Sequence, residues 1–176
     1  MLAVDPTDGT PVDGFGKDGR LDLTPPGDHK GSLSVTVPGV VFRDMLILGF
    51  STSESAEAFP GAICAFSALD GSLVWQFDTI PAPGTAGAET WAEGSLAHAG
   101  GANVWTGMAL DAERALLFAP TGSATPDFYG GKRLGDNLYA PGVYSVDGKQ
   151  YVVIAAGGGR LGQPSGSEYV AFSLPR

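Results

Sequence analysis

The chain is poor in cysteine and histidine. Its 176 residues include one cysteine, Cys64, and two histidines, His29 and His98. A single cysteine cannot form a disulfide within the chain, and this set is too small for a zinc site of the Cys/His type. Cys64 lies in the apolar run of residues 62–66. We therefore expect a buried small hydrophobe at this position and not a reactive thiol.

Charged residues and long apolar runs are also scarce. Charged side chains make up 16% of the chain, and 19 acidic against 10 basic residues give a net charge of −9. Such an acidic surface repels phosphate backbones, so nucleic acid is not expected as a partner. No apolar run approaches the roughly 18 residues of a membrane-spanning helix. Residues 1–5 lack the features of a secretory signal and read as the middle of a strand, so we expect the natural start upstream.

Glycine and proline, by contrast, are abundant. The chain has 27 glycines and 13 prolines, together with 43% hydrophobic residues. The hydrophobic content excludes a solvated, disordered chain. Because glycine and proline both disfavour helices, this composition favours many short strands joined by tight turns.

A strand–turn–strand pattern recurs along the chain. We expect hairpins at residues 40–50, 62–77, 107–121 and 143–156, and a further strand at residues 169–174. Arg43-Asp44 and Asp147-Gly148 occupy two-residue turn positions. Long loops are expected at residues 13–31 and 80–101, with one short helix at residues 89–96 in the second. Hairpins at this spacing indicate a repeat architecture such as a β-propeller, and a β-sandwich remains open as an alternative.

Residues 65–75 (AFSALDGSLVW) form a recognisable motif. The segment resembles the tryptophan-docking repeat of quinoprotein dehydrogenases, with Ser67 where the family has an aspartate. A weaker copy without the tryptophan covers residues 3–9. In such a repeat the glycine, here Gly71, supplies the turn. The resemblance implies that Trp75 packs one blade against the next, which the large aromatic area makes favourable. Trp91 matches no family position, and we expect it to pack within its loop.

A longer succession of motifs sharpens the resemblance. It comprises residues 100–108 (GGANVWTGM), 120–131 (PTGSATPDFYGG) and 135–140 (GDNLYA), supported by residues 15–23 and 146–158. Together they resemble the glucose-dehydrogenase branch of the quinoproteins that depend on pyrroloquinoline quinone (PQQ). The resemblance implies an all-β fold, a partial β-propeller of the quinoprotein alcohol dehydrogenase type, in a single domain over residues 1–176. At about 40–45 residues per blade, the chain supplies about three to four of the family's eight blades.

The order of the motifs contains one break. After residue 140 the family continues with further blades, whereas this chain passes directly to a segment that resembles the last blade. We therefore expect a truncated, internally deleted member of the family, with a junction near residues 140–142.

The resemblance also implies a cofactor site. Trp105 matches the tryptophan on which PQQ stacks, Glu54 with Ser55 beside it matches an acidic position near the quinone and its metal, and Ca²⁺ or Mg²⁺ is the implied ion. Ser123 stands near a position where alcohol-oxidising relatives carry an asparagine ligand, and Thr125 is placed to hydrogen-bond a quinone carboxylate. Each assignment has a structural alternative: Trp105 as another docking tryptophan, Glu54 as a solvated loop residue, and Thr125 as a turn cap.

No catalytic residue is assigned. The family's general base is an aspartate in a segment that has no counterpart in this chain. The sequence therefore predicts part of a PQQ-dependent dehydrogenase that oxidises aldoses or alcohols, with a quinone-type electron acceptor and a periplasmic location by resemblance. The alternative is a non-catalytic propeller scaffold or interaction module. In either case open blade edges would allow self-association.

Overall fold

The computed structural model describes residues 1–25, 31–126, 129, 131 and 137, and the backbone of residues 143–146, 149–156 and 168–173. His29 and the junction expected near residues 140–142 lie outside the described residues. In the part of the chain that is described, no helix has the length and hydropathy needed to cross a bilayer.

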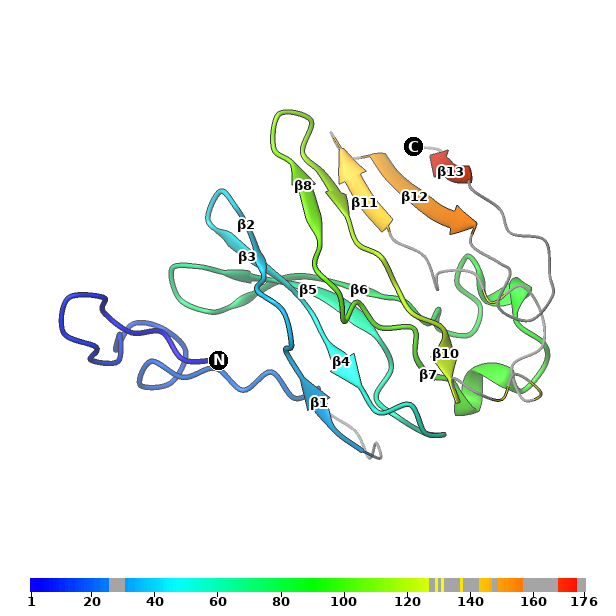
Figure 1. The fold of residues 1–176 in the computed structure, drawn as a ribbon, viewed down its shortest axis with the longest axis horizontal. Helices are drawn as coiled ribbons and strands as arrows, with labels where there is room; N and C mark the ends of the chain where they lie inside the picture. Colours follow the sequence, from blue (N-terminus) through cyan, green and yellow to red (C-terminus); the bar gives the residue numbers. More distant parts are fainter. Residues whose placement is uncertain are drawn as a thin grey trace.

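A four-stranded antiparallel sheet forms the centre of the fold (Figure 1). It contains β2 (Val40–Phe42), β3 (Met45–Gly49), β5 (Ala62–Ser67) and β6 (Leu73–Asp78), in that order across the sheet. The two hairpins predicted at residues 40–50 and 62–77 are thus confirmed. The first turns at Arg43, which has a φ of 54°, and the second at Gly71, which has a φ of 77°. A sheet whose strands follow one another in space and sequence is the expected form of one propeller blade.

The two middle strands of this sheet, β3 and β5, are covered on both faces. Along β5, Ile63 and Ala65 point into a cluster with Ile47 of β3 and Val104. The alternate residues, Cys64 and Phe66, pack on the other face with Leu48 and Phe50, covered by Leu21, Leu23 and Leu33 from the N-terminal part of the chain. Successive side chains of a strand point to opposite faces, so a strand that is apolar at every position requires cover on both.

Cys64 confirms the prediction of a buried thiol. Its side chain is only 6% exposed, and its Sγ lies 3.7 Å from Oε1 of Gln76. Burial, with a smaller contribution from the charge of Asp78, raises the pKa of the thiol to about 11. The thiol is therefore protonated at neutral pH and behaves as a small apolar side chain.

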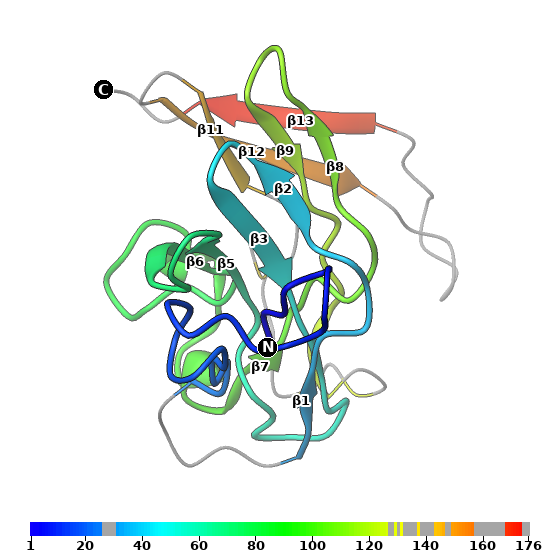
Figure 2. The same ribbon diagram turned by 90° about the vertical axis from the view of Figure 1, so that its left-hand side faces the viewer.

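Further strand pairs surround the central sheet. The hairpin of β8 (Ala109–Asp111) and β9 (Leu116–Phe118) and the three-stranded sheet of β11 (Val143–Val146), β12 (Lys149–Ala156) and β13 (Glu168–Ser173) confirm the remaining predicted strands. β9 lies beside β11 (Figures 1 and 2). Two further two-stranded sheets are short. One pairs β1 (Leu33–Ser34) with β4 (Ser51–Thr52), and the other pairs β7 (Gly100–Gly101) with β10 (Ala124–Thr125).

The loop at residues 80–101 differs from its prediction. The single helix expected at residues 89–96 is wrong, because two short 3-10 helices stand there, η1 (Ala88–Thr90) and η2 (Ser95–His98). Gly94 separates them with a φ of 77°, in the left-handed backbone region that a continuous right-handed helix cannot contain. Trp91 lies between the two turns and is 6% exposed, packed with Ala102 and Ala124. Its predicted role in loop packing is confirmed.

Trp75 lies on β6, the last strand of the central sheet. Its side chain is 37% exposed, and its neighbours Leu73 and Val74 are 53% and 51% exposed. In the described residues this apolar edge has no neighbouring strand on its outer side. The blade-docking role of Trp75 stays a prediction.

Candidate functional site

Trp105 emerges at the surface directly after a buried segment. Ala102 and Val104 are fully buried, whereas the Trp105 side chain is 54% exposed. Val104 belongs to the same cluster as Ile47 and Ile63, so the core of the central sheet anchors the backbone on which the indole stands. The carbonyl oxygen of Trp105 accepts a hydrogen bond from Oγ1 of Thr36 at 3.1 Å. The result is an exposed aromatic ring on a firmly held main chain.

Asn103, two residues before Trp105, forms hydrogen bonds to two other segments of the chain. Its side chain is 9% exposed, and its Nδ2 donates to the carbonyl oxygen of Phe50, 53 residues earlier, at 3.0 Å. Its own carbonyl accepts from the amide of Gly122 at 3.0 Å, and the amide of Ala102 donates to the carbonyl of Ser123 at 2.8 Å. The last of these bonds holds the backbone of Ser123, which is exposed, against Ala102. Asn103 was not predicted as a site residue, although a polar residue between the apolar Ala102 and Val104 is a signal in the sequence.

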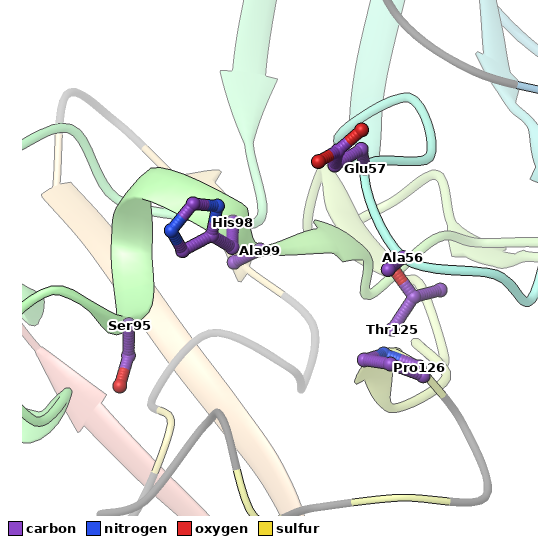
Figure 3. A pocket seen from close by; sticks show the side chains of 7 residues that line it. All are labelled: Ala56, Glu57, Ser95, His98, Ala99, Thr125 and Pro126. Carbon is purple, nitrogen blue, oxygen red and sulfur yellow. The ribbon is translucent and has the colours of Figure 1, made fainter.

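Thr125 has a different environment. It lies in β10, is 3% exposed, and its Oγ1 has no hydrogen-bond partner among the described residues. It lines a cavity of about 30 Å³ with Ala56, Glu57, Ser95, His98, Ala99 and Pro126. In Figure 3, Thr125 lies beside Ala56 and Pro126, whereas Ser95 and His98 come from η2. A space of this size holds one or two water molecules and not a cofactor, since ligand pockets usually measure about 300–1,000 Å³.

Glu54 and Ser55 lie in the exposed loop that follows β4. Oγ of Ser55 lies 2.7 Å from Oγ of Ser53, so the serines organise the loop locally. Within the described residues, no hydrogen bond or ion pair joins Glu54 to Trp105, Ser123 or Thr125. The same part of the chain also contains no group of three or more His, Cys, Asp or Glu side chains that could hold a metal ion. Glu54 therefore offers a single carboxylate and no preformed metal cage.

The structure thus holds the backbone of Ser123 against Ala102, three residues before Trp105. Thr125 is buried, whereas Glu54 and Ser55 are exposed. A second hollow was not predicted. It is an open depression of about 590 Å³ over the loop of residues 83–97, with Glu89, Trp91 and Glu93 among its lining residues. The long loop itself was the only sequence signal for it.

Comparison with known proteins assigns the fold first. The described structure resembles the quinohemoprotein alcohol dehydrogenase ADHIIG from Pseudomonas putida HK5, with a TM-score of 0.61, 24% identity, and coverage of 98% of this chain and 23% of that chain. It also resembles the quinohemoprotein alcohol dehydrogenase from Comamonas testosteroni, with a TM-score of 0.54, 23% identity, and coverage of 72% and 24% of the two chains. The predicted all-β, partial β-propeller fold is confirmed.

The family follows from the sequence comparison. Residues 1–152 match the family described as PQQ: Glucose/ethanol/alcohol dehydrogenase, beta-propeller domain, and the chain belongs to this family. Quinoprotein glucose dehydrogenase A from Acinetobacter calcoaceticus is 30% identical over 137 residues, which are 76% of this chain and 17% of that protein. Quinoprotein glucose dehydrogenase from Gluconobacter oxydans is 29% identical over 154 residues, which are 84% of this chain and 19% of that protein. The chain thus spans less than a fifth of these bacterial relatives.

Family membership implies PQQ as the cofactor, and the described residues fit it in part. The exposed Trp105 indole fits a planar conjugated molecule, because its ring is accessible while its backbone is fixed. The small cavity at Thr125 does not fit PQQ, because it has room for water only. One exposed aromatic ring that could stack on such a molecule is therefore present in the described residues.

Proposed function

We propose that this chain supplies one wall of the PQQ site in a dehydrogenase that oxidises an aldose or an alcohol. The observation that carries the proposal is the exposed Trp105 ring, fixed from below by Val104 and Asn103 within the range that matches the family. An exposed indole offers a large flat apolar face, and a flat conjugated ligand is a suitable partner for it.

The other residues at this surface have supporting parts in the proposal. Ser123 is exposed and follows Gly122, the residue next to the ring, so it offers a hydroxyl to a polar edge of the cofactor. Glu54 offers a carboxylate to Ca²⁺ or Mg²⁺, with Ser55 next to it, since hard cations prefer oxygen ligands. The role predicted for Thr125 toward a quinone carboxylate stays a prediction, because its hydroxyl is buried in the small cavity.

Binding and orientation are the only steps assigned to these residues. When bound, PQQ supplies the two-electron chemistry of substrate oxidation. Trp105 would fix the plane of the ring system and exclude water from one face. We assign no proton-abstracting residue, because no carboxylate or imidazole accompanies Trp105 and Ser123 in the described interactions.

A titration with PQQ, with and without Ca²⁺, tests the proposal. Binding should quench tryptophan fluorescence, and Trp105→Ala should weaken it about tenfold, which corresponds to about 1.4 kcal/mol of lost stacking and burial. Trp75→Ala is the matched control, because Trp75 is also partly exposed but lies on β6. Equal weakening by both variants, or no binding to the unaltered chain, would refute the proposed site.

The metal assignment has its own test. Glu54→Gln removes the charge and keeps the shape of the side chain, so it should abolish any increase in PQQ affinity that Ca²⁺ produces. Glu113→Gln is a suitable control, because Glu113 is also an exposed loop carboxylate but follows β8. A calcium effect that survives Glu54→Gln would remove Glu54 from the site.

The open edge of the central sheet supports a second candidate function as an interaction module. Leu73, Val74 and Trp75 expose apolar surface on β6, whose outer side has no partner strand in the described residues. Such an edge favours pairing with another strand, including one from a second copy. Light scattering should then show concentration-dependent association, and Val74→Lys should reduce it. A monomer at all concentrations would argue against this function.

Substrate, electron acceptor and location complete the proposal. The preference for an aldose over a simple alcohol is supported by the resemblance of residues 120–131 and by the glucose dehydrogenases among the relatives. We further propose a quinone-type electron acceptor and a periplasmic location, both from family resemblance. Assays of the complete gene product with glucose and ethanol as alternative substrates would test the preference.

A further inference from the structure

We propose that Gly122 positions the Trp105 indole. Because residue 122 has no side chain, the five-membered ring of the indole can lie next to its Cα. This position of the indole sets the angle at which the ring faces a planar ligand. The consequence for PQQ binding rests on the function proposed above, whereas the position of the ring does not.

The immediate contacts of Gly122 carry the inference. A Cβ atom added at Gly122 would lie 3.4 Å from Nε1 and 3.6 Å from Cδ1 of Trp105. The next nearest atom is the carbonyl oxygen of Asn103, at 3.7 Å. A first methyl group would therefore be in ordinary van der Waals contact with the ring, and a γ carbon directed toward the ring would need the volume that the ring occupies.

The backbone at Gly122 does not by itself require glycine. Its φ lies outside the left-handed region, so other residues can adopt the same conformation. Its amide is fixed by the bond to the carbonyl of Asn103 at 3.0 Å. Glycine at this position is thus explained by the space next to the indole and not by backbone strain.

The Trp105 main chain cannot easily move away from a larger side chain. Thr36 holds its carbonyl oxygen, and the preceding Val104 is fully buried in the core. The ring can therefore respond only by rotating about its side-chain torsions. Because the ring is already 54% exposed, rotation toward solvent meets little resistance.

A graded series at residue 122 tests the inference in the complete chain. Gly122→Ala should leave the ring in place, and Gly122→Val should displace it; Gly122→Ser serves if valine prevents folding. Gly107→Ala and Gly107→Val are matched controls, because a Cβ at Gly107, two residues from Trp105, meets no atom within 4 Å. The fluorescence of Trp105 is isolated as the difference from the same variant with Trp105→Phe.

The expected results are spectroscopic first. Gly122→Val should move the Trp105 emission to longer wavelength and increase its quenching by acrylamide, while the alanine variant and both Gly107 variants resemble the unaltered chain. PQQ affinity should fall about tenfold in Gly122→Val and less than about twofold in Gly122→Ala.

The outcomes separate this inference from the proposed function. Unchanged emission and quenching in Gly122→Val and Gly122→Ser, or equal changes in the Gly107 variants, overturn the positioning role. A displaced ring with unchanged PQQ affinity overturns its consequence for binding. A displaced ring in a chain that binds no PQQ at all refutes the stacking function and supports the positioning role of Gly122.

Discussion

The bond between Asn103 and Phe50 gives the sharpest prediction about stability. Asn103→Ala removes a buried hydrogen bond of 3.0 Å that joins two segments 53 residues apart. Loss of a buried donor leaves its acceptor without that partner, which costs about 1–3 kcal/mol. The backbone bond from Gly122 to Asn103 does not depend on the side chain and remains. We therefore expect the free energy of unfolding to fall by about 2 kcal/mol.

Urea unfolding followed by fluorescence measures this change. With a denaturant slope of about 2 kcal/mol per molar, the midpoint should fall by about 1 M at an unchanged slope. Thr36→Val is the matched control, because it removes a hydrogen bond of similar length, 3.1 Å, at an exposed position. Its effect should stay within about 0.5 kcal/mol.

Asn103→Asp adds a pH signature to the same experiment. An ionised carboxylate cannot donate to the Phe50 carbonyl, whereas the protonated acid can. The folded state therefore raises the pKa of the new carboxyl group. Relative to Asn103→Ala, the stability of this variant should be highest below pH 4 and fall as the pH rises through that raised pKa. The reasoning fails if Asn103→Ala lowers the free energy of unfolding no more than Thr36→Val does. It also fails if Asn103→Asp loses no stability relative to Asn103→Ala between pH 4 and 7.

Three further predictions concern the core and the turns. Ile63→Ala, at a side chain 1% exposed, should cost about 2–5 kcal/mol in urea unfolding, and a loss below 1 kcal/mol would contradict the packing. Cys64 should react with a thiol reagent at pH 8 only on unfolding, because burial raises its pKa to about 11; relative to Cys64→Val, stability should fall between about pH 9 and 11, where the unfolded thiol ionises first. Asp70 accepts hydrogen bonds from the amide and hydroxyl of Ser72, which lower its pKa. Its contribution to stability is present at neutral pH and lost on acidification, so thermal melting of Asp70→Ala should show a weaker decline toward pH 3 than the unaltered chain.

The positions of the hairpins could be predicted from the sequence. Residues 40–49 and 62–78 form the expected pairs, because short apolar runs and a turn at Arg43 or Gly71 act between neighbours in the chain. The family motifs could likewise be recognised from the sequence, because each one is a continuous run of residues. The prediction of one helix at residues 89–96 was wrong, because Gly94 adopts a left-handed conformation that divides the segment into two short 3-10 helices.

The exposure of the three tryptophans depended on tertiary structure. Trp91 is buried, Trp75 is partly exposed and Trp105 is most exposed, although all three lie in similarly apolar or small-residue surroundings along the chain. Burial depends on which distant segments pack against a residue, and these are not its neighbours in sequence. The candidate site shows the same division. The sequence by itself determined that Trp105, Ser123 and Thr125 lie in segments that resemble family motifs, whereas only the tertiary structure decided that Trp105 and Ser123 are exposed and that Thr125 is buried. The reason is that long-range contacts, such as the 53-residue link from Asn103 to Phe50, set which side chains reach solvent.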